Sequence, residues 1–237
     1  LRMTAGTARS AKRAPLALVL AIDTSGSMAG NAIEDARAAA KALVGALRDD
    51  DRIAIVTFDS RAEVLVATTE LKTAGRAKIL ARIDAMQARG TTDLANGMAT
   101  ALNQINVAPA DAVRRIVVLS DGVPNDATAI PGISESLRGS GVAVTTLGFG
   151  LEYDETLLGQ IAQTTGGRFH RVADDEKLEQ AFVDEAFRIE RVVASNVVVR
   201  LQAGPGVEIR RVLGHPAVPA GSRTHGVALA DLSEGQH

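Results

Sequence analysis

The 237-residue chain contains no cysteine and no tryptophan, and aromatic residues make up only 3% of it. Without cysteine, the chain has no disulfide, no thiolate nucleophile and no cysteine-based zinc site. The scarcity of aromatic rings leaves little surface for stacking nucleic-acid bases or sugars. A net charge of −2 without a long basic stripe gives no electrostatic reason to expect a nucleic-acid partner.

Long apolar runs are also missing from the sequence. None approaches the roughly 20 residues that a membrane-spanning helix needs. Residues 1–15 carry four basic side chains but lack the apolar core of a signal peptide. Because the first residue is Leu1, a preceding signal is left open. The compartment therefore stays unassigned, with a lean towards an extracytoplasmic one.

What the chain does contain is an alternation of apolar strands with amphipathic helices. Hydrophobic residues make up 46% of the sequence, and most of them are aliphatic. Continuous apolar runs predict buried parallel strands, and apolar residues at spacings of three and four predict helices. The predicted strands cover residues 16–23, 51–59, 114–122, 142–150 and 166–172, with 62–71 as an antiparallel edge strand. The predicted helices cover residues 32–47, 73–87, 94–107, 130–139, 154–164 and a last one that is capped by Asp174 or Asp175 and reaches about 191. This order predicts a doubly wound α/β fold with a mostly parallel sheet.

The pattern changes near residue 194. Residues 195–214 alternate with period two and carry a Gly-Pro-Gly turn at 204–206, and 222–232 has the pattern of another strand, so this part is predicted to be antiparallel β. Two or three strands do not make a stable sandwich alone. We therefore predict three parts: a flanking segment at 1–14, the α/β domain at 15–192, and a partial β-rich module at 193–237.

Oxygen-bearing side chains gather where predicted strands end. Asp23, Ser25 and Ser27 follow the first strand, Thr91 and Thr92 precede a helix, and Ser120 and Asp121 end a later strand. Carboxyl ends of parallel strands share one edge of a sheet, where ligands bind. Hydroxyl and carboxylate oxygens suit Mg²⁺ or Mn²⁺, and Ca²⁺ less well. Each group alone is better explained as a helix cap, and only their coincidence favours a metal site.

The sequence gives less support to a catalytic function. The Asp-Thr-Ser-Gly stretch lacks the second motif and the all-β fold of an aspartic protease, and no G-x-S-x-G nucleophile elbow, phosphate loop or dinucleotide fingerprint is present. His170 falls within a predicted strand, where a structural role is favoured. A metal-dependent hydrolase of phosphate or ester substrates stays open, with Asp59 or Asp93 as its general base or second carboxylate.

Three short motifs together resemble a known family. "DTSGSM" (23–28), "GTTDL" (90–94) and "SDG" (120–122) resemble the metal-ion-dependent adhesion site of von Willebrand factor type A domains, also called integrin I-like domains. The resemblance covers residues 15–192, and 147–178 is similar to bacterial members in particular. It implies a Rossmann-like fold and a metal bound by five residues: Asp23, Ser25, Ser27, Thr92 and Asp121.

The resemblance also implies how such a site works. Neutral hydroxyl ligands leave the cation electrophilic, and one coordination position stays open for an Asp or Glu of a protein partner. We therefore expect a non-enzymatic adhesion or assembly module that uses Mg²⁺ (Mn²⁺ or Ca²⁺ as substitutes), with partner contacts at Met28, Asn31, Asp59, Asp93 and Asn125. A subunit of an ATPase-driven intracellular machine is the other open role. The terminal β segment resembles strands that flank such domains in bacterial relatives of inter-α-trypsin inhibitor heavy chains and calcium-activated chloride channel regulators.

Overall fold

The computed structural model describes residues 15–109, 112–150, 152–172, 178–190, 192–194, 197–212, 218–228 and 232–233. The chain divides into two compact units, one ending at Arg191 and the other containing Val192 onwards. Each unit is described by itself below. The predicted helix cap at Asp174 or Asp175 lies outside the described residues. No helix in the described ranges is both long and apolar enough to span a membrane.

The first unit is built on a six-stranded sheet with the order β3-β2-β1-β4-β5-β6. Its edge strand β3 runs antiparallel to β2, and the other neighbours are parallel. All eight residues of β1 are buried, as its continuous apolar run predicts. The bounds are β1 Leu16–Asp23, β2 Arg52–Phe58, β3 Ala62–Glu70, β4 Val113–Ser120, β5 Ala143–Gly148 and β6 Phe169–Arg171.

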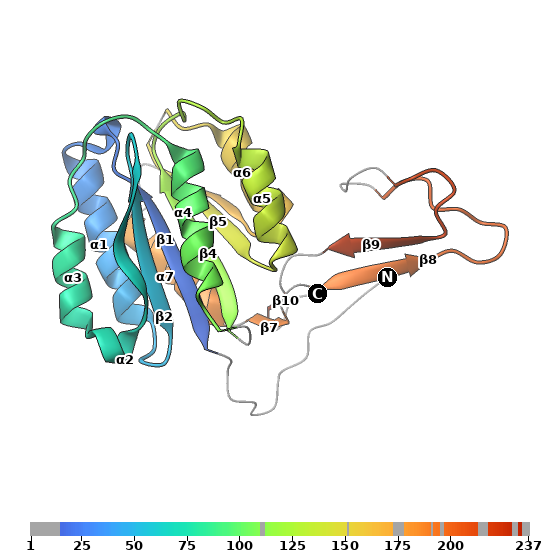
Figure 1. The fold of residues 1–237 in the computed structure, drawn as a ribbon, viewed down its shortest axis with the longest axis horizontal. Helices are drawn as coiled ribbons and strands as arrows, with labels where there is room; N and C mark the ends of the chain where they lie inside the picture. The colour runs from blue at the N-terminus through green and yellow to red at the C-terminus, as the bar shows by residue number, and fades with distance from the viewer. Residues whose placement is uncertain are drawn as a thin grey trace. The chain divides into compact units, whose positions relative to one another are not determined.

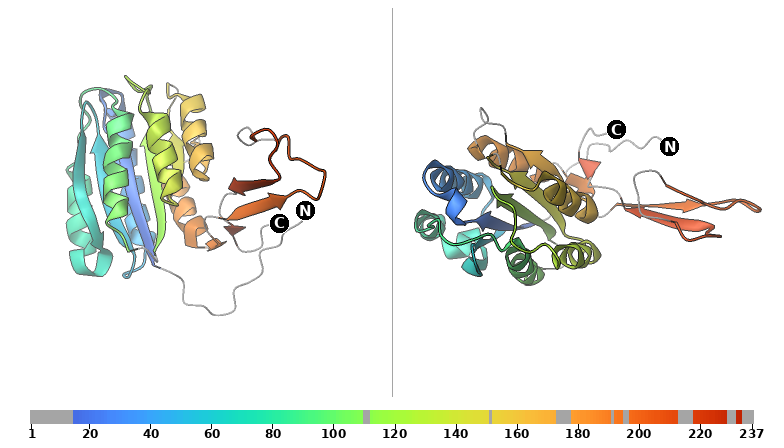
Figure 2. Two further views of the ribbon diagram at one scale, coloured as in Figure 1. Left: turned by 45° about the vertical axis from the view of Figure 1, so that its right-hand side comes forward. Right: turned by 90° about the horizontal axis from the view of Figure 1, so that it is seen from above.

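Helices cover both faces of this sheet and make a three-layer α/β/α unit (Figure 2). Alternate residues of β1 point to opposite faces: Leu16, Leu18 and Leu20 pack with α1, α3 and α7, whereas the intervening Ala17 and Val19 pack with α4, α5 and α6. The structure thus confirms the predicted doubly wound fold. The helices are α1 Asn31–Ala46, α2 Leu71–Ala74, α3 Arg76–Asp84, α4 Leu94–Asn106, α5 Ile130–Gly139, α6 Glu155–Thr165 and α7 Leu178–Glu190.

The order of the strands places a switch point between β1 and β4 (Figure 1). From β1 the chain winds outwards through β2 to β3, and then returns so that β4 pairs with the other side of β1. In open α/β sheets the crevice at the carboxyl ends of such strands is the usual ligand site. The ends of β1 and β4 therefore lie where a ligand is expected.

The helix predicted over 73–87 is divided in the structure. Gly75 has a φ of +78°, which ends α2 and starts α3, and α3 itself ends at Asp84. Residues 85–93 then form an irregular segment that returns to the sheet, where the backbone N–H of Arg89 donates to the carbonyl of Thr24 over 2.7 Å. This segment carries Thr92 to the end of β1.

The second unit contains two short antiparallel pairs. β8 (Val198–Gln202) pairs with β9 (Thr224–Ala228), and β7 (Val192–Ala194) pairs with β10 (Leu232–Ser233). The antiparallel β structure predicted for this part is present, and the chain does turn at 204–206, but residues 207–212 form no strand. After the turn, the backbone N–H of Ile209 donates to the carbonyl of Ser222. The antiparallel partner of β8 is β9, which lies further along the chain.

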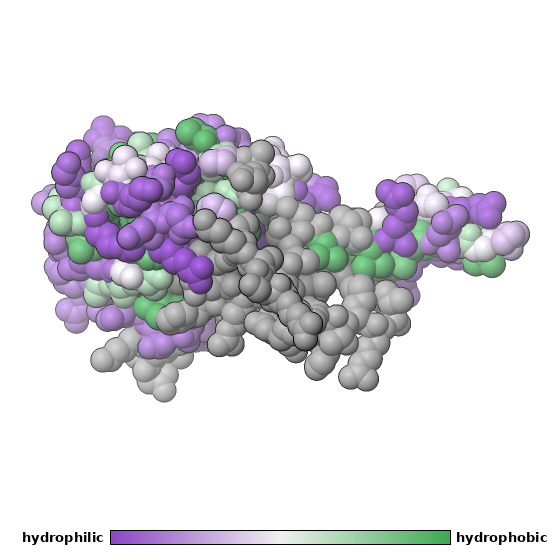
Figure 3. All heavy atoms as spheres, turned by 90° about the horizontal axis from the view of Figure 1, so that it is seen from below, coloured by the Kyte–Doolittle hydropathy of each residue, from purple (hydrophilic) through white to green (hydrophobic). Residues whose placement is uncertain are grey.

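The large hydrophobic side chains that the described surface exposes are scattered: Val64, Val107, Val123 and Val207. On the face drawn in Figure 3, hydrophilic side chains cover most of the described surface of the α/β unit. Single exposed apolar residues are normal for a globular protein and mark no binding surface by themselves.

Candidate metal site at the carboxyl edge of the sheet

Asp23 is the last residue of β1 and is completely buried. The backbone N–H of Ser25 donates to Asp23 Oδ1 over 2.8 Å, and Ser120 Oγ, at the end of β4, donates to Asp23 Oδ2 over 2.7 Å. Each carboxylate oxygen therefore has one fixed donor. The parallel pairing of β1 with β4 brings Ser120 to Asp23 although 97 residues separate them.

The two serines that follow Asp23 lie on a tight turn. The chain leaves β1 through a short 3-10 helix at Gly26–Met28, which brings Ser25 Oγ and Ser27 Oγ to 2.9 Å from each other. Ser27 Oγ in turn donates to Asp121 Oδ1 over 2.8 Å. The two hydroxyls thus link the end of β1 to the residue that follows β4.

Thr92 reaches the same place from the segment before α4. A Cβ atom built on Gly122 would lie 3.3 Å from Thr92 Oγ1 and 3.7 Å from Ser27 Oγ. Both hydroxyls therefore face one small space that the missing side chain of Gly122 leaves free. Thr92 is 6% exposed, and its carbonyl accepts a hydrogen bond from the backbone N–H of Asn125 over 3.0 Å.

The two carboxylates of this cluster are held without a compensating positive charge. Burial raises the pKa of Asp23 from 3.8 to about 6; hydrogen bonds from Ser25 and Ser120 oppose the rise, and the nearby charge of Asp121 adds to it. The pKa of Asp121 is also raised, again mainly by burial, with the hydrogen bond from Ser27 opposing. Within the described part of the chain, neither carboxylate forms an ion pair with a Lys or Arg.

This donor set fits a hard divalent cation. Mg²⁺ and Mn²⁺ prefer oxygen ligands, and a cation would stabilise the two ionised carboxylates that burial disfavours. The space next to Gly122 lies beside two of the hydroxyls. No group of three or more His, Cys, Asp or Glu side chains that could hold a metal occurs among the described residues. A site here would accordingly depend on hydroxyl ligands as well as carboxylates.

The residues predicted to contact a partner have different surroundings. Asn31 and Asn125 are exposed, as a contact residue must be, but Met28 is fully buried in the core, which corrects its predicted role. Asp93 caps α4: its Oδ1 accepts from the backbone N–H of Asn96 over 3.1 Å, and its Oδ2 accepts from the Asn96 side chain over 2.6 Å.

Asp59 is also engaged in the fold. Its side chain is 8% exposed, and its Oδ2 lies 2.7 Å from Arg89 Nε in an ion pair. Its Oδ1 accepts from the backbone N–H of Arg61 over 3.2 Å. Both carboxylates that were considered as a general base, Asp59 and Asp93, are thus engaged in contacts within the fold.

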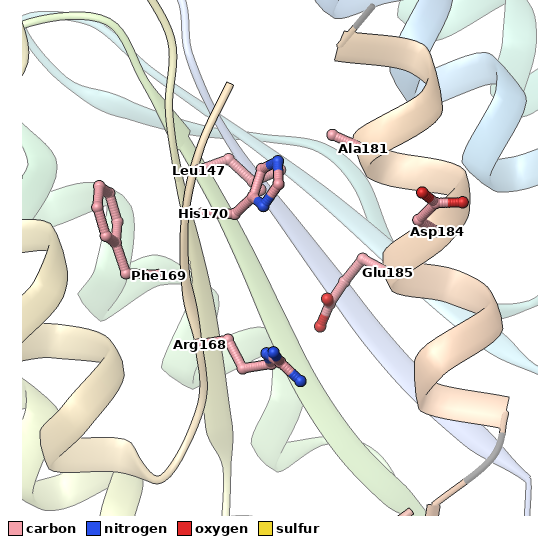
Figure 4. Close-up of a pocket in the computed structure, with 7 residues that line it drawn as sticks. All are labelled: Leu147, Arg168, Phe169, His170, Ala181, Asp184 and Glu185. Atoms are coloured by element: carbon pink, nitrogen blue, oxygen red, sulfur yellow. The ribbon is translucent and has the colours of Figure 1, made fainter. Parts of the chain in front are cut away.

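His170 lies in β6, two strands away from β4, and lines a separate cavity of about 130 Å³ between β6 and α7 (Figure 4). Arg168, Asp184 and Glu185 line it too, and Glu185 Oε1 accepts a hydrogen bond from Thr145 over 2.6 Å. None of the five predicted metal ligands contributes to this cavity.

The sequence predicted that the five oxygen-bearing residues lie near one another, but it did not indicate the groups that position them. Ser120 was noted only as one more polar residue, whereas the structure makes it the donor to Asp23. Arg89 and Ser60 were not considered at all. Both act across about 30 residues of sequence, through Asp59 and Thr91, and no local motif signals such contacts.

Comparisons with known proteins agree with this architecture. The family model of the von Willebrand factor type A domain matches residues 17–184. An uncharacterized protein from Synechocystis sp. is 28% identical over 199 residues, which cover 82% of this chain and 46% of that protein. The chain thus spans less than half the length of this relative.

Two solved structures share the fold at low identity. A von Willebrand factor type A protein from Catenulispora acidiphila has a TM-score of 0.81 at 22% identity, covering 93% of this chain and 55% of that one. Proximal thread matrix protein 1 from the mussel byssus, described with a zinc-occupied MIDAS motif (metal-ion-dependent adhesion site), has a TM-score of 0.63 at 21% identity and covers 73% of this chain and 46% of its own. With its family model matched over most of the α/β unit, the chain belongs to the von Willebrand factor type A family.

Proposed function

We propose that this chain is a divalent-cation-dependent protein-binding module. Asp23, Ser25, Ser27, Thr92 and Asp121 hold the cation, and the cation binds an Asp or Glu side chain of a protein partner. The observation that carries the proposal is the convergence of two buried carboxylates and three hydroxyls at one edge of the sheet. No described Lys or Arg neutralises these carboxylates, so a bound cation would supply the missing charge.

Mg²⁺ is the proposed cation. The donors are all oxygens, and Mg²⁺ commonly retains open or water-filled positions beside one or two carboxylates. Mn²⁺ has the same ligand preference and serves as its experimental substitute, and Ca²⁺ is a further alternative. The zinc-occupied motif of the mussel protein supports a divalent cation at the equivalent place in a related fold.

Binding is favoured over hydrolysis because the two carboxylates considered as a general base are engaged in contacts within the fold. Metal-assisted hydrolysis needs a group beside the metal that activates water. The two candidates, Asp59 and Asp93, are held by Arg89 and by the start of α4. A cation with an open coordination position can hold a partner's carboxylate without such a group.

The partner surface would surround the open coordination position. Asn31 and Asn125 are exposed on the segments that follow the serines and Asp121, and Val123 is 60% exposed beside Gly122. We propose that these side chains contact residues next to the partner's carboxylate. Such contacts would select among the many proteins that carry exposed Asp or Glu.

A peptide selection tests this function directly. Peptides displayed on phage and selected on the immobilised protein in Mg²⁺ should share an Asp or Glu and should elute with EDTA. Changing that residue to Asn or Gln should abolish binding, because the neutral amide is a much weaker ligand for the cation. Selection of peptides that bind equally well in EDTA, or that tolerate the amide, contradicts the proposal.

The space beside Gly122 gives a second prediction. In Gly122→Ala, a methyl group enters next to the hydroxyls of Thr92 and Ser27. We expect Mn²⁺ affinity to fall about tenfold, the lower end of the loss seen when the groups around metal ligands are changed, while the thermal midpoint of the metal-free protein stays close to wild type. Calorimetric titration measures the affinity. Gly132→Ala is the matched control, because nothing lies within 4 Å of its added methyl group; an equal loss in both variants contradicts the prediction.

A further inference from the structure

The segment that carries Thr92 is held on one side by the β2–β3 turn. The carbonyl of Asp59 accepts a hydrogen bond from the backbone N–H of Asp93 over 2.8 Å. Ser60 Oγ accepts one from the backbone N–H of Thr91 over 3.1 Å. The residues on both sides of Thr92 are thus bound to two consecutive residues of this turn.

The ion pair between Asp59 and Arg89 ties the start of the same segment to the turn. Arg89 Nε donates to Asp59 Oδ2 over 2.7 Å, and Arg89 Nη2 donates to Glu63 Oε1 over 3.0 Å. The carboxylate of Asp59 is 8% exposed, whereas the Arg89 side chain is 53% exposed. Asp59 is therefore the buried member of the ion pair, and Arg89 is the exposed member.

The same segment is also bound to the first motif. The backbone N–H of Arg89 donates to the carbonyl of Thr24 over 2.7 Å, and the N–H of Gly26 donates to the carbonyl of Gly90 over 3.0 Å. Gly90 has a φ of +70°, and a Cβ on it would lie 2.5 Å from Ser60 Oγ. Only glycine fits this close approach, so the position of residues 89–93 is set on two sides.

We propose that Asp59 and Arg89 are a positioning pair: their ion pair holds the 89–93 segment so that Thr92 Oγ1 faces the metal, and it raises metal affinity without either side chain touching the cation. The inference rests on the function proposed above, since it assigns a role at the same site. Groups that orient metal ligands typically contribute 10- to 100-fold to metal affinity. Loss of the pair loosens the part of the segment that carries Thr92 and weakens the Thr92 contact, while the backbone hydrogen bonds of residues 89 and 90 to Thr24 and Gly26 keep the serine turn in place.

The test compares Mn²⁺ affinity across four single variants, measured by calorimetric titration into chelator-stripped protein. Arg89→Met should weaken binding about tenfold, Asp59→Asn should do the same with an isosteric side chain, and Arg89→Lys should restore much of the affinity. Arg61→Met is the matched control: Arg61 Nη2 pairs with Glu63 over 2.7 Å, but its side chain forms no hydrogen bond or ion pair with the described residues 89–93. The Mn²⁺ affinity of Arg61→Met should equal that of the wild type.

A double variant tells positioning through Thr92 from a general weakening of the fold. In a Thr92→Val background the hydroxyl is already gone, so adding Arg89→Met should cause little further loss of Mn²⁺ affinity. The same further loss in both backgrounds overturns the inference, as does unchanged affinity in Arg89→Met and Asp59→Asn. If the wild type itself binds no Mn²⁺, the proposed function fails together with this inference; if only the variants behave unexpectedly, the inference fails alone.

Discussion

Replacing Asp23 with Asn is expected to abolish metal binding and, at the same time, to stabilise the metal-free protein. Asp23 is completely buried, and its two oxygens accept hydrogen bonds from Ser25 and Ser120. The rise of its pKa from 3.8 to about 6 corresponds to a cost of up to about 3 kcal/mol for the ionised side chain in the folded state. Asn has the same shape without the charge, so it removes this cost together with the main negative ligand.

The difference in stability between Asp23→Asn and the metal-free wild type should depend on pH, and its direction follows from the raised pKa of Asp23. Between pH 3.8 and about 6 the folded metal-free protein holds a proton on Asp23 that the unfolded chain has released. Stability from this group therefore increases as the pH falls from 7 towards 4, and is lost again as the pH rises through the folded pKa. The advantage of Asp23→Asn over wild type should be largest near pH 7.5 and should shrink towards pH 5.

Urea unfolding of both proteins in chelator, at several pH values, measures this difference. Repeating the series with Mn²⁺ should reverse the order, because only the wild type gains binding free energy from the metal. An Asp23→Asn protein that is less stable than wild type at every pH without metal would show that Asp23 stabilises the fold by its charge. That result contradicts the assignment of Asp23 as a ligand held ready for a cation.

Gly167→Ala is expected to be among the most damaging single-methyl changes in the α/β unit. A Cβ on Gly167 would lie 2.0 Å from the carbonyl oxygen of Val144 and 2.5 Å from its carbonyl carbon. Both atoms belong to the backbone of β5, so no side-chain rotation relieves the overlap. Overpacking a core commonly costs 1–3 kcal/mol and can cost more, and we expect roughly 3 kcal/mol here, which lowers the thermal midpoint by about 6–12 °C in a unit of this size.

Gly159→Ala provides the matched control for this prediction. Gly159 lies within α6, and nothing lies within 4 Å of an added methyl group. Alanine is a better helix former than glycine, so this variant should be about 0.5–1 kcal/mol more stable than wild type. Differential scanning calorimetry of the three proteins gives both values. A Gly167→Ala protein that melts within a degree of wild type would show that the chain before β6 can move away from β5.

The fold and the first residues of the candidate metal site could be predicted from the sequence because both depend on local patterns. The apolar run at 16–23 predicts a strand buried on both faces, and it forms β1 with every residue buried. Asp23, Ser25 and Ser27 follow at alternate positions of one turn, so their proximity depends on few residues. Thr92 and Asp121 could be added because strand ends and the segments near them share one edge of a parallel sheet.

Other features depend on contacts between distant residues, and local patterns do not indicate them. The ion pair of Asp59 with Arg89 spans 30 residues and requires the irregular segment after α3, where the periodicity suggested a continuous helix. In the second unit, period-two alternation indicated antiparallel β but not which segments pair, and the partner of β8 is β9, about 20 residues further along the chain. Met28 was predicted to contact a partner, yet the 3-10 turn directs its side chain into the core.

The most direct test of the proposed metal site is a calorimetric titration of Mn²⁺ into chelator-stripped protein. Wild type should bind one ion per chain, Asp23→Asn should bind none, and Thr92→Val, which removes only a hydroxyl, should bind more weakly than wild type. Folding of each variant is checked by circular dichroism before the titration. If folded wild type takes up no Mn²⁺, or if Asp23→Asn binds as tightly as wild type, the cluster at the end of β1 is a hydrogen-bonded turn between a strand and a helix and not a metal site.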